Sequence, residues 1–143
     1  MNGQTEGAWW ARAAAADLKP FIGQGQLSAM RQACKGEEGN WFIVRMVELA
    51  AEILAMPKTY EQDGMGDAAV VHLHYFKGGA DWYITERDSE TDQMQAFGLA
   101  DLFQDGGELG YISITELIEN GAELDLHFKP CTLAQIRAKQ VTA

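Results

Sequence analysis

Three scarcities narrow the class of protein before any motif is considered. The 143-residue chain has two cysteines, too few for a disulfide-stabilised scaffold. No stretch approaches the roughly 18 uncharged apolar residues of a membrane-spanning helix, so we expect no integral membrane protein. Basic residues are also few, 11 against 21 acidic residues, which gives a formal charge of −10. This balance argues against direct binding of nucleic acid.

The length and composition predict one globular domain. Hydrophobic residues make up 47% of the chain and charged residues 22%, which is ordinary for a folded protein. We expect an N-terminal extension over residues 1–25 and a domain over residues 26–143. Within that domain we place a helical part (26–56), a sheet part (68–128) and a C-terminal helix (132–140).

The N-terminal part has the patterns of helices. Residues 8–16 are mostly alanine, the residue with the highest helix propensity, and predict a short helix. A second short helix is predicted over residues 26–34. Residues 41–56 give the clearest helix, because Phe42, Met46, Leu49 and Ile53 repeat at helical spacing. We expect the paired indoles of Trp9 and Trp10 to dock on the domain, since exposed apolar pairs favour aggregation.

The chain after residue 68 has the alternation of strands. Residues 69–77 and 81–87 flank Gly78-Gly79 and predict a hairpin. Further strands are predicted over 95–103, where Gly98 indicates a bulge or a close contact, and over 108–112. Short connections make an antiparallel meander the simplest arrangement, with residues 124–128 as a possible edge strand.

Two capping boxes predict short helices among and after these strands. Ser113 with Glu116 opens a helix through residues 117–118, and Thr132 with Gln135 opens one over residues 133–139. The predicted fold is therefore α+β, a single domain. Its N-terminal helices pack on a four- or five-stranded, mainly antiparallel sheet, followed by short C-terminal helices.

The negative charge is concentrated in residues 81–128. This segment holds twelve of the acidic residues and one basic residue, so its formal charge is −11. It is either a solvated face that keeps the protein soluble or a surface for a basic partner. For the second case we predict five partner contacts, listed here: Glu86, Asp88, Asp101, Asp105 and Glu108.

Candidates for catalysis or metal binding are weaker. His72 and His74 share one face of a predicted strand, and Asp81, Glu86 or His127 are possible further ligands, but no spacing fixes a third ligand. Structural histidines are the alternative. Cys34 and Cys131 lie in no Cys-x-x-Cys pattern, and we find no nucleophile elbow, Walker motif or His-Glu-x-x-His. We therefore assign no catalytic residue, no metal and no cofactor.

Aromatic residues are frequent in the predicted sheet. Those outside the core would lie among the carboxylates, a composition suited to binding arginine or lysine side chains. The aromatic residues considered are Trp82, Tyr83, Phe97, Phe103, Tyr111 and Phe128.

Four stretches together resemble a known family over about residues 57–133. They are 75–86 (YFKGGADWYITE), 97–102 (FGLADL), 108–117 (ELGYISITEL) and 125–133 (DLHFKPCTL). The family is an uncharacterised domain of unknown function, number twenty-nine fifty-eight. Its members are small acidic bacterial proteins, many carried by plasmids and prophages, and it supplies no catalytic residue to transfer.

The resemblance and the charge together suggest a non-enzymatic, acidic protein-binding module of a mobile element. Its partner would be a basic surface of a host defence or DNA-processing protein, as for an anti-restriction or anti-CRISPR inhibitor or a DNA mimic. The alternatives are an oligomeric scaffold protein and, less favoured, a small metal-assisted hydrolase using His72 and His74. Two free cysteines and the absence of a signal segment favour the cytoplasm.

Overall fold

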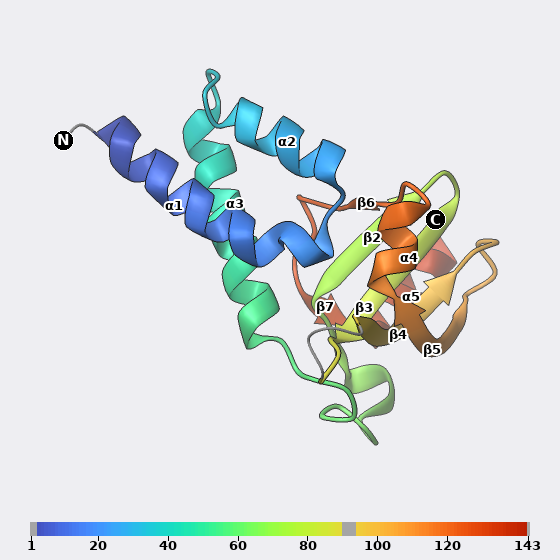
Figure 1. Ribbon diagram of the computed structural model, residues 1–143. Helices are drawn as coiled ribbons and strands as arrows, with labels where there is room; N and C mark the ends of the chain where they lie inside the picture. The colour runs from blue at the N-terminus through green and yellow to red at the C-terminus, as the bar shows by residue number, and fades with distance from the viewer. Residues whose placement is uncertain (1–2, 90–93, 143) are drawn as a thin grey trace. The chain divides into compact units, whose positions relative to one another are not determined.

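The computed structural model describes residues 3–89 and 94–142, and the chain divides into two compact units, residues 1–55 and 56–143. Figure 1 shows the helices of the first unit and the sheet of the second. The predicted α+β class is confirmed. No helix among the described residues is long and apolar enough to cross a membrane.

The first unit consists of three α-helices and a short 3-10 helix. These are α1 (Gly3–Leu18), η1 (Lys19–Phe21), α2 (Gln24–Ala33) and α3 (Gly39–Ala55), so all three predicted helices are confirmed. Helix α1 packs on α3, and its buried residues include Ala11, Ala14 and Ala15, whose small side chains let the helices approach closely. Trp9 and Trp10 are both more than half exposed, so the expectation that they dock is wrong.

The second unit is built on an antiparallel sheet of five strands. Its order is β5-β4-β3-β2-β6, and the strands are listed here: β2 (Leu73–Lys77), β3 (Ala80–Glu86), β4 (Gln95–Asp101), β5 (Glu108–Ser113) and β6 (Glu123–Leu124). The predicted four-stranded meander is confirmed, because β2 to β5 are neighbours in chain order. Residues 123–124 form the edge strand beside β2.

The predicted strand over residues 69–77 is interrupted at His72. Before it, β1 (Val70–Val71) leaves the main sheet and pairs with β7 (Cys131–Thr132). After it, β2 begins the hairpin with β3. The predicted alternation nevertheless holds across the break, because Val71, Leu73 and Tyr75 are buried and their neighbours are less so.

Helices lie on both sides of the sheet: α4 (Ile114–Glu119) in front and α5 (Leu133–Thr142) behind in Figure 1. Both begin as their capping boxes predict. Ser113 Oγ accepts from the Glu116 amide at 3.2 Å, and Thr132 Oγ1 accepts from the Gln135 amide at 3.2 Å. A 3-10 helix, η2 (Gly66–Ala68), precedes β1.

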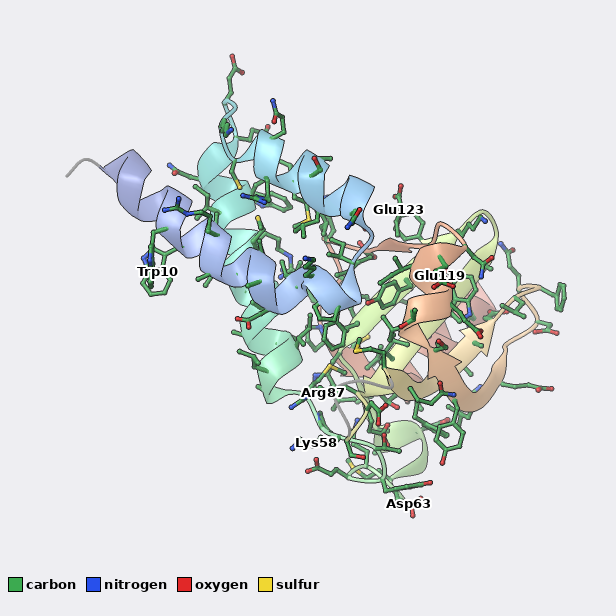
Figure 2. All side chains as sticks on the ribbon, viewed as in Figure 1. Trp10, Lys58, Asp63, Arg87, Glu119 and Glu123 are labelled. Carbon is green, nitrogen blue, oxygen red and sulfur yellow. The ribbon has the colours of Figure 1, made fainter. Side chains whose placement is uncertain are left out.

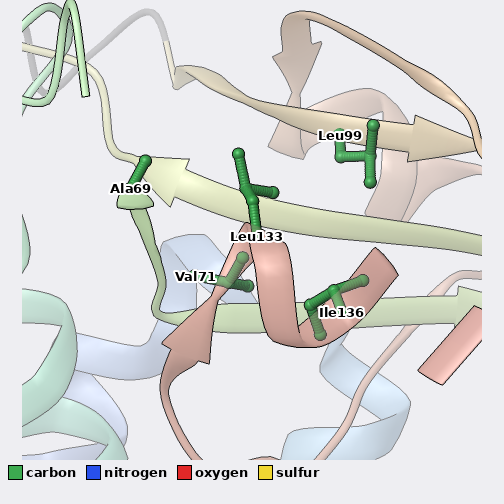
Figure 3. Close-up of a cluster of buried hydrophobic side chains, with 5 residues drawn as sticks. All are labelled: Ala69, Val71, Leu99, Leu133 and Ile136. Carbon is green, nitrogen blue, oxygen red and sulfur yellow. The ribbon is translucent and has the colours of Figure 1, made fainter. Parts of the chain in front are cut away.

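A cluster of buried side chains joins α5 to the sheet (Figure 3). Leu133 and Ile136 of α5 contact Leu99 of β4 and the β1 region at Ala69 and Val71. The covered face of the sheet is therefore the one to which Leu99 and its register partners point. Polar side chains that point to the same face as Leu99 therefore lie on the side of the sheet that α5 covers.

Candidate functional site

Strand register places several carboxylates in one row across the sheet. Glu123 of β6 pairs with Phe76 of β2, Phe76 pairs with Asp81 of β3, and Asp81 pairs with Asp101 of β4. Residues in one row of a sheet point to the same face, here the face covered in part by α5. We call Glu123, Phe76, Asp81 and Asp101 the acidic row.

His74 belongs to the neighbouring row on the same face, where it pairs with Tyr83 of β3. His74 Nε2 is 2.7 Å from Asp81 Oδ1, and its Nδ1 is 2.9 Å from Asp125 Oδ2. Carboxylate oxygens accept hydrogen bonds, so both bonds form together only when each ring nitrogen carries a proton. Through these two contacts the His74 ring links β2, β3 and the chain after β6.

Aromatic rings enclose the histidine on the same face. The ring of Tyr83 stacks on His74 at a centroid distance of 4.7 Å, and Phe128 lies 5.7 Å away. Burial first, and then the nearby acidic groups led by Asp81, raise the pKa of Tyr83 to about 12. The phenol therefore stays protonated throughout the physiological range.

His74, one of the two weak candidates for a metal or hydrolase site, has both ring nitrogens in contact with carboxylates. Both ring nitrogens are engaged by carboxylates, so neither is available as a ligand or a general base unless one bond breaks. In the described part of the chain, no three His, Cys, Asp or Glu side chains are arranged to hold a metal ion. His72 does not join His74 in such a group, whereas Asp81, a suggested partner, does contact it.

Asp101 acts in the structure as the anchor of the loop that follows β4. It is 3% exposed, its Oδ1 accepts from the Asp105 amide at 3.2 Å, and its Oδ2 accepts from Gln140 of α5 at 2.9 Å. The loop also needs Gly107, with φ at +74°, where a Cβ would lie 2.6 Å from the Ala100 carbonyl oxygen. These contacts fix the loop over residues 102–107, whose Phe103 side chain is 82% exposed.

The five predicted partner contacts fall at opposite ends of the sheet. Asp101, Asp105 and Glu108 lie at the end that carries the acidic row, because Asp101 ends β4 and Glu108 begins β5. Glu86 and Asp88 follow the far end of β3, a strand of seven residues or about 23 Å. The five carboxylates therefore do not form one cluster.

Two of those five side chains are withdrawn from the surface. Glu86 is 5% exposed and accepts from the Thr85 hydroxyl, and Asp101 is buried beneath its loop. Asp105 and Glu108 are exposed, and Asp88, which accepts from the Gln95 amide, is half-buried. Asp105 and Glu108 are thus the predicted contacts that best fit a partner surface.

The six predicted aromatic residues are distributed over several contacts instead of one patch. Tyr83 and Phe128 pack around His74, while Phe97 and Tyr111 meet edge to face at 5.6 Å. Only Phe103 is almost fully exposed. The aromatic ring within the acidic row belongs to Phe76, which is 37% exposed and was not among the six.

Sequence reasoning therefore missed Phe76, Glu123 and Asp125 as parts of the site. The alternation of residues 69–77 puts Phe76 on the same strand face as His74. The pairing of Glu123 and Asp125 beside β2 had no comparable signal, because β6 has two residues and joins the sheet out of chain order.

Comparison with known proteins gives one informative result. Neither the curated proteins nor the solved structures provided a match to the chain. A family model matches residues 45–134, from within α3 to the start of α5, and so covers more than half of the chain. This agrees with the expected span of about residues 57–133. The chain belongs to the family described as Protein of unknown function (DUF2958).

Proposed function

We propose that the protein is a non-enzymatic module that binds a basic surface of a partner protein through the end of the sheet carrying the acidic row. The supporting observation is the shared location of exposed carboxylates and exposed apolar side chains at this end. Asp105 lies in the loop that carries Phe103, Glu108 directly follows that loop, and Glu123 pairs with Phe76. Figure 2 labels Glu123 in the upper part of the second unit and Asp63 in its lower part.

The acidic row suits an arginine or lysine side chain of the partner. Phe76 presents an aromatic ring between the register positions of Glu123 and Asp81. A guanidinium group over such a ring would gain a cation–π contact and charged hydrogen bonds to the flanking carboxylates. Aromatic anchors surrounded by polar groups are typical of the energetically dominant part of an interface.

The structure around His74 also favours binding over catalysis. Asp81 and Asp125 each contact one ring nitrogen of His74. These contacts hold the two carboxylates in place and use both nitrogens of the imidazole in this site. A rigid, pre-arranged surface loses less entropy when it binds. The family membership suggests where such a module works: we propose a mobile element whose product meets a host defence or DNA-processing protein in the cytoplasm.

Charge reversal at two exposed residues tests this proposal. We expect the double variant Glu108→Lys with Glu123→Lys to bind a partner purified by affinity capture at least about tenfold more weakly. Each exposed ion pair at the edge of an interface contributes up to roughly 1 kcal/mol, and after charge reversal the same pairs repel. Neither side chain makes a hydrogen bond or ion pair with another described residue. The measurement is the Kd by calorimetry.

The matched control changes the net charge equally at sites away from the acidic row. Glu61 and Asp63 are exposed in the loop that precedes η2 in the second unit, and Glu61→Lys with Asp63→Lys adds the same positive charge. We expect this control to bind within about twofold of the unaltered protein, since distant exposed charges are screened by salt. Equal weakening in both double variants would show that net charge, and not this surface, governs binding.

A further inference from the structure

The three helices of the first unit enclose an open groove. Its volume is about 1480 Å³, and every lining residue lies between positions 11 and 43 of the first unit. This exceeds the roughly 300–1,000 Å³ of ordinary small-molecule sites. In Figure 1, α3 passes behind α1 and continues beside α2, so α1 and α2 can form the walls of the groove.

The walls of the groove are positively charged, in contrast to the chain as a whole. Arg12 and Lys19 line it from α1 and η1, and Arg31 and Lys35 line it from α2 and the residues just after it. Glu37 is the one acidic residue of the lining. All four cationic side chains are exposed, so they are accessible to a ligand in the groove.

The lining also includes apolar side chains from all three helices. They include Ala11 and Ala15 of α1, Leu27 of α2 and Ile43 of α3, of which Leu27 and Ile43 are only half-buried. Met30 is the one residue of α2 that is fully buried. Part of the apolar face of α2 therefore remains available to a further packing partner.

We propose that this groove binds an amphipathic helix of a partner protein that carries carboxylates beside its apolar stripe. Each wall carries two cationic residues: Arg12 of α1 with Lys19 of η1, and Arg31 of α2 with Lys35 in the turn after it. Carboxylates beside the apolar stripe of a docked helix would face these two pairs of opposite charge. A ligand with a single anionic head group would leave most of the four cations unused.

This helix is a different partner from the basic surface proposed for the second unit. The groove needs an acidic ligand and the acidic row needs a basic one, and the two sites share no residue. Failure of one proposal therefore leaves the other intact.

The two cysteines provide a direct test. Cys34 lines the groove, whereas Cys131 lies in the second unit and serves as an internal control. The probe is a synthetic helical peptide with leucine along one stripe and glutamate beside it. At a peptide concentration of ten times Kd, we expect alkylation of Cys34 to slow about tenfold, and that of Cys131 to stay unchanged, by mass spectrometry.

Variants show whether the cationic walls are responsible. Arg31→Glu with Lys35→Glu is expected to abolish the protection of Cys34, whereas Lys58→Glu with Lys129→Glu, an equal charge change in the second unit, is expected to preserve it. Protection is the ratio of rates with and without peptide for the same variant. This ratio is needed because burial raises the pKa of Cys34 and Arg31 lowers it, so the variant changes the unprotected rate as well.

The controls also define what would overturn the proposal. A peptide with lysine in place of glutamate should give no protection, and far-UV circular dichroism should show unchanged helix content in the variants. Absence of protection by the glutamate peptide, or equal protection by the lysine peptide, would overturn an acidic helix as the occupant.

Discussion

Replacing Gly98 by alanine is expected to destabilise the second unit by about 3 kcal/mol or more, near the upper end of what single substitutions do. A Cβ at this position would lie 2.0 Å from the Tyr83 carbonyl oxygen and 3.0 Å from the Ile84 Cα. Both contacts are with backbone of the adjacent strand, where the register also shifts between Ile84 and Glu86. The added Cβ could escape these two clashes only if β3 and β4 moved apart.

Gly110 provides the matched control, because it pairs with Gly98 across the sheet. A Cβ at Gly110 meets no atom within 4 Å, and its φ is not positive. We expect Gly110→Ala to change the free energy of unfolding by less than about 1 kcal/mol. Urea denaturation followed by circular dichroism measures both variants, and equal stability of the two would contradict the close strand contact at Gly98.

A rise in pH from about 10 to about 12 is expected to destabilise the second unit through its buried tyrosines. Tyr75 is fully buried, which raises its pKa strongly, and burial together with nearby acids raises that of Tyr83 to about 12. In the unfolded chain both phenols lose their protons near pH 10. Between these limits the unfolded chain binds fewer protons than the folded one, so the free energy of unfolding falls as pH rises.

The slope of stability against pH identifies the residue responsible. One tyrosine that stays protonated only in the folded state contributes a loss of about 1.4 kcal/mol per pH unit. We therefore expect Tyr75→Phe to reduce the slope above pH 10 by about this amount, as measured by urea denaturation at a series of pH values. An unchanged slope in Tyr75→Phe would show that its hydroxyl is not kept protonated by burial.

The sequence predicted the elements that depend on local patterns. The stripe from Phe42 to Ile53, the alternation around Tyr75 and the capping boxes at Ser113 and Thr132 each correspond to an element of the structure. Gly98 was singled out as a bulge or a close contact; the close contact occurs at Gly98, whereas the register shift lies in the adjacent strand, between Ile84 and Glu86. These signals involve residues near one another in sequence, where spacing and local chemistry determine the conformation.

The site could be predicted only in part, because it depends on long-range pairing. Asp125 meets His74 across 51 positions of sequence, and this contact follows from β6 joining β2 out of chain order. The burial of Asp101 depends on Gln140 of α5, which no spacing connects to it. Charge counting therefore found the acidic segment but could not separate carboxylates that anchor loops from those that face a partner.

The salt dependence of partner binding is the most direct test of the acidic row as a binding surface. Exposed charges are screened within about 10 Å at 0.1 M salt and about 3 Å at 1 M. We predict that the affinity for the captured partner falls at least about tenfold between about 0.05 M and about 0.5 M salt, and that the variant with Glu108→Lys and Glu123→Lys shows a much flatter dependence. An affinity that is independent of salt, or a slope that is the same in the variant, would contradict the proposed function.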